Sequence, residues 1–573
     1  MDRNNLANRI KDSVPICITG MVFVLLTASV KTLAVNGNIV WNFGFVIKLI
    51  ILSLIFGIII GFGLNEIVGF FLKHVTIPEE KLKVKNALPV FFIAFAVLIL
   101  ATLPYFLAYY PGILAYDSYI QIDQIFTGAY NEHHPLIHTL LIKFCMLAGE
   151  KLFGSLNAGV AVTVLVQWIL LDFAFSYGIY LLFKRGKKAL SIITLIILAL
   201  FPFNAFMAIS ITKDIPFSAY FLMLILSSSE LLRSEKIGKE KFFDILILII
   251  SGLGMNVYRN KGKYALIFVI AVCVVLTIIR LTLKKKDEDG RKLTKNYMIT
   301  LGVTALSLVL AIVLLTVASK SLNATQGDRR EMLSVPIQQL ARTYVYHSGS
   351  GVVKEDDNTL DSDSKNLINE FILYDGALLY KSDISDPVKR CVNTWVVTNK
   401  TSEFVKTYIK LFAKYPGDYI NAFLGTNAGF FDFTDETHAH INEIEGQKGL
   451  GYVQTKWNES LFEKGFSQDS KIKGLFNFLE NLTNDNVYLN IPFLKYLFMP
   501  GIYLWIYIFA MVYAFKKKNM RVAFAISLMA GYYITMLLGP TVQLRYVYPA
   551  MITVPFMTLF LNGSKKTEGN EEK

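Results

Sequence analysis

The feature that most restricts the fold of this chain is a series of apolar stretches, each about as long as a helix that crosses a membrane. A helix spans the hydrocarbon core of a bilayer with about 20 apolar residues. The stretches cover residues 13–34, 44–64, 88–109, 158–182, 189–207, 215–232, 243–258, 264–283, 297–318, 494–515, 521–539 and 544–562. We therefore predict an all-α polytopic membrane protein with about twelve transmembrane helices.

The composition agrees with a membrane protein and excludes other classes. Of the 573 residues, 54% are hydrophobic and only 18% are charged, whereas soluble domains carry about 25% charged residues. This bias excludes a soluble or disordered chain. The four cysteines form no CxxC pair and indicate no disulfide framework. The net charge of +13 does not indicate nucleic-acid binding, because most basic residues stand in short clusters directly after apolar stretches.

These basic clusters predict how the chain lies in the membrane. They occupy residues 1–12, 73–85, 184–188, 233–241, 284–295 and 516–521 and part of the tail 563–573. With the spans given above, all of them fall on one side, which the positive-inside rule makes cytoplasmic. We therefore expect an integral protein of a bacterial plasma membrane, with a cytoplasmic tail.

The apolar stretch 135–153 looks long enough to cross the membrane, but a crossing there would place the basic cluster 184–188 outside. We interpret it as a helix on the external surface. A second surface helix is predicted just before it, because its apolar and polar residues separate onto two faces. Tyr119, Ile122 and Phe126 share one face, and Asp117, Gln121 and Gln124 share the other. The external loop 110–157 is thus expected to contain two surface helices.

The chain divides into five predicted parts. They are a two-helix membrane segment (1–87), a membrane core that includes the external loop (88–318), an external domain (319–490), a three-helix membrane segment (491–562) and the cytoplasmic tail (563–573). The external domain is polar, carries short helical patterns and is long enough to fold as a mainly α-helical unit.

Several charged residues stand on the predicted external side, where basic residues are unexpected. The basic ones are Lys213, Arg259, Lys261, Lys263 and Arg545. Cations at one membrane level, near Asp117, are suited to binding an anionic group such as phosphate. Each of them is also compatible with a long side chain that extends from a helix end to the interface.

Two acidic residues stand at the same level. Asp117 follows a span that ends in aromatic residues, where a partly desolvated carboxylate can act as a general base on a hydroxyl group. A surface-helix residue or an N-cap is the commoner explanation of such an aspartate. Asp214 precedes Pro216 at the start of a span, which is typical of a helix N-terminus.

Two segments raise the question of a divalent cation. His134 and His138 stand four residues apart, but Pro135 explains the same stretch as the start of a helix. The densest set of potential ligands is Asp432, Asp435, Glu436, His438 and His440. Solvated loop residues are the commoner explanation of such a set. A divalent cation is therefore one possible cofactor, and the sequence identifies no other.

In their order along the chain these elements resemble the GT-C superfamily of membrane glycosyltransferases, and more narrowly its protein mannosyltransferase and aminoarabinose transferase members. The resemblance rests on the external Asp117, on HHPLIHTLLIKFCMLAGEKLFG (133–154), on the basic end of the next span and on ALFPFNAFMAISITKD (199–214). It covers about 88–283. The chain departs from the pattern in having two spans before the first such loop, in lacking an acidic neighbour of Asp117, and in carrying the large segment 319–490.

The resemblance implies roles for individual residues. Asp117 matches the catalytic aspartate of the first external loop, and Asp214 matches a second acidic residue that binds the acceptor or a cation. His134, followed by Pro135, matches the start of the second surface helix and is a further candidate for acceptor or cation binding. The resemblance implies donor-phosphate binding at the basic stretch that holds Arg259, Lys261 and Lys263. Lys213 and Arg545 are further candidates because of their own position, as cations on the predicted external side.

We therefore expect a glycosyltransferase that moves a hexosyl or pentosyl group from a polyprenyl-phosphate donor to a glycan, lipid or protein acceptor of the cell envelope. Its partners would be these substrates and the membrane lipid. An alternative is a polysaccharide polymerase or ligase that acts on lipid-linked glycans. Its chemistry would lie in 319–490, at Arg329, Arg330, His347, His438 or His440. A transporter or flippase would be expected to show an internal repeat, and the sequence has none that we can detect.

Overall fold

The structure of the protein is a computed structural model. It describes residues 3–75, 86–114, 116–233, 239–282, 288–434, 436, 459–484, 486–516 and 522–561. Among these residues the regular elements are helices, apart from two strands of two residues each. The structure confirms the prediction of an all-α membrane protein.

Seven helices of the described chain are long and apolar enough to cross a membrane. They are α1 (Arg3–Asn36), α2 (Phe43–Val75), α3 (Leu88–Ala108), α6 (Leu156–Lys184), α9 (Asp214–Arg233), α11 (Gly262–Thr282) and α12 (Glu288–Ser321). An eighth candidate is a bent pair, α7 (Lys188–Leu200) and α8 (Pro202–Ala208), with 63° between the two helices. Pro202 begins α8 and explains the bend, because proline disfavours a helical conformation at the preceding residue.

The four remaining predicted spans are also helical. They correspond to α10 (Lys239–Val257), α22 (Pro500–Lys516), α23 (Ala523–Leu537) and a broken helix made of α24 (Leu544–Thr553), η7 (Val554–Phe556) and α25 (Met557–Leu561). These helices are shorter or more polar than the seven, so the number of twelve spans stays a prediction.

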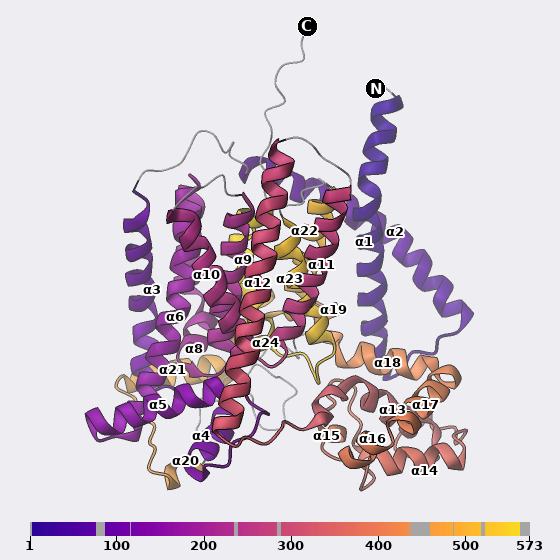
Figure 1. Cartoon of the computed structure of the whole chain (residues 1–573). Coiled ribbons are helices and arrows are strands. Elements are labelled where there is room, and N and C mark those ends of the chain that lie inside the picture. The colour runs from indigo at the N-terminus through magenta and orange to yellow at the C-terminus, as the bar shows by residue number, and fades with distance from the viewer. Residues whose placement is uncertain are drawn as a thin grey trace.

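The long helices stand side by side, and the surface helices gather at one end of them (Figure 1). This end contains α4 (Tyr116–Thr127), α5 (Leu136–Phe153), α20 (Glu459–Glu463) and α21 (Lys473–Asn484). The helix α6 starts beside α5 and runs 29 residues, a length of about 43 Å. The basic cluster 184–188 therefore lies at the opposite end of the bundle from α4 and α5.

The helix α4 does not present its polar face to solvent, as a surface helix would. Gln121 and Gln124 are buried, and so are Tyr119 and Ile122 of the apolar face, whereas Phe126 is exposed. The polar residues point inward because they find partners there: the Gln121 amide donates to the Thr139 hydroxyl at 2.8 Å. Helix α4 is therefore packed on its polar side as well as on much of its apolar side, whereas a surface helix would expose its polar side.

Helix α5 is held against α6 by two glycines. A Cβ atom on Gly149 would lie 2.0 Å from the backbone nitrogen of Gly159, so the two backbones touch. This close approach fixes α5, and with it the histidines at its start, against a membrane helix. It is consistent with α5 being a packed helix at the membrane surface, and α5 is not among the spanning helices.

We expect Gly149→Ala to destabilise the protein measurably. The new methyl group meets backbone atoms of α6, which cannot move aside as a side chain would, and overpacking of this kind costs about 1–3 kcal/mol. The measurement is the thermal unfolding midpoint in detergent. Gly63→Ala in α2 is the matched control, because nothing lies within 4 Å of its added Cβ. Equal midpoints for the two variants would contradict the prediction.

The segment 319–490 forms two parts that differ in their packing. The first begins with η1 (Arg329–Met332) and continues with α13 (Ser334–His347), α14 (Ser362–Phe371), η2 (Gly376–Leu379), α15 (Asp386–Lys389), α16 (Thr394–Asn399), α17 (Thr401–Lys414) and α18 (Pro416–Thr426). Its apolar side chains, from Ile337 to Tyr419, form a core of their own. We call this part, residues 329–426, the α13–α18 domain.

The second part packs on the membrane helices. It contains α19 (Ala428–Phe431), α20, α21, η4 (Val487–Asn490) and the adjoining η5 (Leu494–Phe498). Its buried residues, such as Phe430, Leu479 and Tyr488, belong to the main core of the bundle. The α13–α18 domain is therefore the part of this segment that has an independent core.

Candidate functional site

Two short strands bring two acidic residues together. The strand β1 (Ile113–Leu114) pairs in parallel with β2 (Ser210–Ile211), and Leu114 stands opposite Ile211. Asp117 and Asp214 each lie three residues beyond that pair, in the first turns of α4 and α9. A helix N-terminus favours a negative charge. The pairing thus places two carboxylates side by side at the start of two helices.

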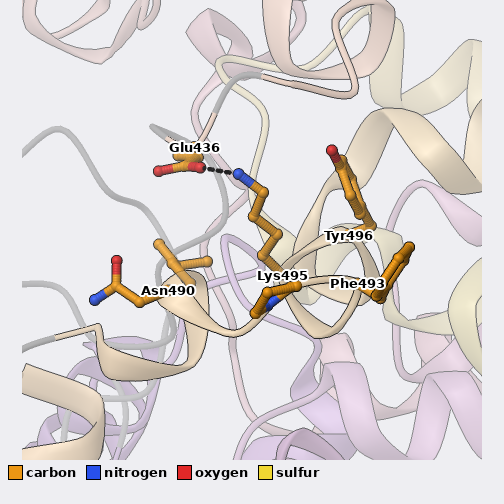
Figure 2. A pocket seen from close by; sticks show the side chains of 7 residues that line it. Glu436, Asn490, Phe493, Lys495 and Tyr496 are labelled. Atoms are coloured by element: carbon orange, nitrogen blue, oxygen red, sulfur yellow. Dashed lines mark hydrogen bonds and ion pairs between the residues drawn. The ribbon is translucent and has the colours of Figure 1, made fainter.

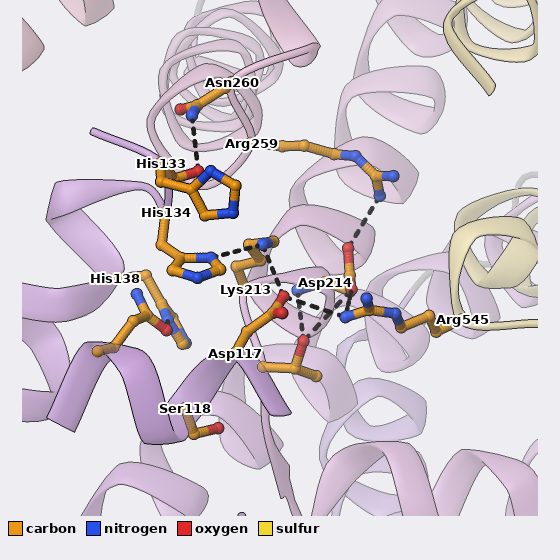
Figure 3. A network of polar contacts seen from close by, with 12 residues as sticks. Asp117, Ser118, His133, His134, His138, Lys213, Asp214, Arg259, Asn260 and Arg545 are labelled. Carbon is orange, nitrogen blue, oxygen red and sulfur yellow. Dashed lines mark hydrogen bonds and ion pairs between the residues drawn. The ribbon is translucent and has the colours of Figure 1, made fainter. Parts of the chain in front are cut away.

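Three cations surround these carboxylates (Figure 3). Lys213 Nζ lies 2.6 Å from Asp117 Oδ2, and Arg545 Nη1 lies 3.1 Å from the same oxygen. Arg545 Nη1 also lies 3.4 Å from Asp214 Oδ2, so it bridges the two carboxylates. On the other side, Arg259 Nη1 is 2.9 Å from Asp214 Oδ1. We call these five residues the charge network.

The charge network is well shielded from solvent. The side chain of Asp214 is fully buried, and that of Arg545 is 6% exposed. The guanidinium of Arg259 also lies over three aromatic rings, at 5.1 Å from Phe217, 5.4 Å from Tyr532 and 5.1 Å from Tyr546. Three cations against two carboxylates leave one net positive charge, and a poorly solvated positive charge is suited to binding an anion.

The charge network keeps Asp117 ionised. Burial by itself would raise the pKa of the Asp117 carboxyl, but the charges of Lys213 and Arg545 outweigh it and lower the pKa well below the usual value. An ionised carboxylate held by two cations is a weak base. A ligand that competes for Lys213 and Arg545 would therefore raise the basicity of Asp117.

His134 offers a hydrogen-bond donor beside the network. Its Nδ1 lies 3.1 Å from Lys213 Nζ, and because an ammonium group can only donate, this nitrogen accepts. Burial, and then the charge of Lys213, lower the pKa of His134 to about 2, so the ring is neutral. The proton is then on Nε2, which is buried and has no hydrogen-bond partner among the described residues. Such a donor is suited to an oxygen atom of a ligand.

A second group of polar side chains fixes α4 and α5 to α6. His138 Nδ1 lies 2.8 Å from Gln121 Oε1, and Gln167 Nε2 lies 2.9 Å from His138 Nε2. Gln167 also donates to the backbone oxygen of Thr212 at 3.2 Å, directly before Lys213. Since Gln121 follows Asp117 by about one helical turn, these bonds hold the carboxylate in place.

The sequence did not identify Gln121, Gln167 or Tyr532 as site residues. The Tyr532 hydroxyl accepts a hydrogen bond from Arg259 at 3.1 Å. The polar face of α4 was the one signal for Gln121. Gln167 is a single amide within an apolar span, where a buried polar residue indicates a specific partner.

The structure brings together six of the predicted site residues and leaves two aside. The six are Asp117, His134, Lys213, Asp214, Arg259 and Arg545. Lys263 is exposed, with its ammonium 5.2 Å from the ring of Tyr264. Lys261 is half-buried and faces charged residues of the α13–α18 domain, and burial followed by the charge of Arg259 lowers its pKa to about 8.

The described residues contain no group of three or more histidine, cysteine, aspartate or glutamate side chains that could hold a metal ion. Asp435, His438 and His440, predicted as possible ligands, lie outside the described residues. Asp432 accepts from the backbone and hydroxyl of Thr434. Glu436 pairs with Lys495 at 2.8 Å beside a pocket of about 470 Å³, which Figure 2 shows.

The alternative candidates of the polymerase hypothesis lie elsewhere. His347 of the α13–α18 domain lies between Asp357 and Asp418, 2.7 Å from a carboxylate oxygen of each. Arg330 pairs with Asp328 at 3.0 Å, and no shared site between Arg330 and His347 is seen in the described chain.

Neither the curated proteins nor the solved structures contain a match to this chain. A family described as a family of unknown function, DUF6020, matches residues 126–573. This range includes every residue of the charge network except Asp117. Because it covers well over half of the 573 residues, the chain belongs to the DUF6020 family.

Proposed function

We propose that the protein is a membrane glycosyltransferase of the GT-C type, which transfers a sugar from a polyprenyl-phosphate donor to an acceptor hydroxyl group. The observation that carries the proposal is the charge network, with two carboxylates and three cations at one end of a bundle of membrane helices. This end also carries the packed surface helices α4 and α5. The acceptor would be a glycan, lipid or protein of the cell envelope.

The donor phosphate would be held by Lys213 and Arg545. Both now neutralise Asp117, so a phosphate that engages them would weaken their pull on the carboxylate and raise its pKa. Binding of the donor would thereby turn Asp117 from an ion-pair partner into a general base. His134 Nε2–H would donate to an oxygen of the bound donor or acceptor.

The transfer step would proceed with inversion at the anomeric carbon. The acceptor oxygen forms a bond to that carbon as the bond from the carbon to the phosphate oxygen breaks. The acceptor proton passes to the Asp117 carboxylate. The electron pair of the broken bond stays on the polyprenyl phosphate, whose charge Arg545 and Lys213 stabilise. Asp214 would serve to hold Arg259 and Arg545 in position.

We further propose that the bundle has about twelve spans and that its charge network faces the outside of a bacterial plasma membrane. The basic cluster 184–188 supports this orientation, because it lies at the end of α6 away from the network. Labelling of introduced cysteines in intact cells tests the orientation. Labelling at residue 186 by an impermeant reagent, without labelling at residue 128, would contradict it.

Donor binding is tested by measuring the affinity of the purified protein, in nanodiscs, for polyprenyl phosphate. Arg545→Gln is expected to weaken binding about tenfold to a hundredfold, because it removes a charge-assisted hydrogen bond worth about 1.5–3 kcal/mol. Lys263→Gln is the matched control, since Lys263 is exposed and lies outside the network. Equal affinities of the two variants would contradict phosphate binding at Arg545.

The polymerase alternative would locate the chemistry in the α13–α18 domain. Its strongest candidate, His347, is hydrogen-bonded to carboxylates at both ring nitrogens, which leaves neither nitrogen to act on a substrate. The charge network is the better supported site. The two hypotheses are distinguished by an assay of labelled-sugar transfer by the purified protein. The assay compares His347→Gln with variants of the charge network.

A further inference from the structure

The helix α17 of the α13–α18 domain has three distinct faces. Phe404, Thr407 and Leu411 are buried in the domain. A second face exposes a stripe of apolar side chains. They are Val405 (45% exposed), Ile409 (58%) and Phe412 (49%). These positions are four and three residues apart, so they lie on one line along the helix.

The third face of α17 is basic. Lys406, Lys410 and Lys414 follow the apolar stripe on one side. From Lys400 to Lys414 the chain carries four lysines and one glutamate, a net charge of +3. Lys410 and Lys414 contact Asp361 and the backbone of Thr359 in the same domain. An apolar stripe beside a basic one is typical of a helix that lies in the headgroup region of a bilayer.

The position of the domain places this helix at the end of two membrane spans. Helix α18, which follows α17, is bound to the loop between α1 and α2: Trp41 Nε1 donates to Asn421 Oδ1 at 2.9 Å, and Asn421 Nδ2 donates to Asn38 Oδ1 at 2.8 Å. Arg342 of α13 donates to the same Asn38 oxygen at 2.7 Å. Figure 1 shows α18 beside the end of α1, with α17 next to it.

The apolar surface continues from the domain to these spans. Phe412 packs against Tyr419 of α18, with ring centroids 5.4 Å apart, and Ile420 beside it is exposed. In the α1–α2 loop that binds α18 and at the start of α2, Val40 and Phe43 are 67% and 82% exposed. Because α1 and α2 leave the bilayer at this loop, the nearest apolar phase is the adjoining leaflet.

We propose that α17 rests on the membrane leaflet at which α1 and α2 are connected. Its stripe of Val405, Ile409 and Phe412 inserts at the boundary between headgroups and acyl chains. Lys406 faces lipid phosphates, while Lys410 and Lys414 keep their contacts within the domain. The lipid surface would thereby hold the α13–α18 domain against the bundle, in addition to the contacts through Asn38 and Asn421. This inference is independent of the proposed transferase activity.

The test uses the full chain in nanodiscs of phosphatidylethanolamine and phosphatidylglycerol. A fluorophore is attached to a cysteine at residue 409 or 412 in a Cys391→Ala background, because the other three native cysteines are buried. Control sites are Glu403, on the opposite side of α17 from the stripe, and Tyr374, which is 89% exposed. Gel filtration verifies that each labelled variant folds. Spin-labelled lipid and aqueous iodide then serve as two quenchers.

Quenching by spin-labelled lipid is expected to be at least about twofold stronger at 409 and 412 than at 403 and 374, with the reverse order for iodide. Equal quenching by iodide at all four sites, with one copy in each nanodisc, would overturn the proposal. So would shielding of 409 and 412 that appears only when several copies share a vesicle, because the stripe would then be a contact between copies.

Discussion

Replacement of Asp117 by asparagine is expected to lower sugar transfer by about a hundredfold to ten-thousandfold, the range that a general base contributes. Asparagine has nearly the same shape and can still accept hydrogen bonds from Lys213 and Arg545, but it cannot take a proton from the acceptor. The measurement is the rate of transfer of labelled sugar from polyprenyl-phosphate donors by purified protein in nanodiscs, at saturating donor.

The control for Asp117→Asn is Asp123→Asn on the same helix. Asp123 is exposed and pairs, among the described residues, with Lys464 at 2.9 Å, so this change should leave the rate unaltered. If Asp117→Asn transfers sugar at the wild-type rate while the wild type is active, the chemistry lies elsewhere. Binding of polyprenyl phosphate by the same variant separates a loss of catalysis from a loss of donor binding.

Asp117 also gives a pH-dependent contribution to stability. Its pKa is lower in the fold than in the unfolded chain, so its ionised form stabilises the fold at neutral pH. This stabilisation is present above the unfolded pKa of about 3.9 and is lost as the pH falls toward the lower folded value.

The largest effect on stability is expected from Asp214→Ala, which should destabilise the protein by about 3–5 kcal/mol. Asp214 is fully buried and pairs with both Arg259 and Arg545. Its removal leaves Arg259 in a poorly solvated place without its carboxylate partner. We expect little folded protein after extraction in detergent, and a strongly lowered unfolding midpoint for what remains.

A double variant shows whether the unpaired charge is the cause. Asp214→Ala combined with Arg259→Gln removes both members of the pair and should recover part of the lost stability, since a buried charge no longer lacks its partner. Arg545 keeps Asp117 as a partner in this variant. An additive or larger loss in the double variant would show that packing of the two side chains, and not their charge, dominates.

Much of the site could be predicted from the sequence. Lys213, Arg259 and Arg545 were selected because they stand where the positive-inside rule makes basic residues unexpected, and the structure places all three around Asp117 and Asp214. A basic residue on the side of the membrane where basic residues are rare indicates a specific partner, because removing a cation from water without a partner costs free energy. The same argument selected Lys261 and Lys263, which lie outside the network, since a loop position does not determine where a flexible side chain points.

The sequence could not show that the polar side of α4 is buried. An amphipathic pattern separates polar from apolar residues but does not reveal which face the rest of the protein covers. Gln121 is buried because His138 and Thr139, on another helix, supply its hydrogen-bond partners. Likewise, β1 and β2 have two residues each, which is too short for a strand to be recognised in the sequence. Their register nevertheless sets the two carboxylates side by side.

What the sequence by itself determined was that the chain forms apolar helices able to cross a membrane, with particular charged residues at their ends. Helix length and apolar character are local properties, and lipid permits few alternatives to a helix. The tertiary structure decided which of those ends meet. Arg545 reaches Asp117 across 428 positions of sequence, and such a contact arises from packing among α4, α9 and α24, where close-packed side chains select one arrangement of the bundle.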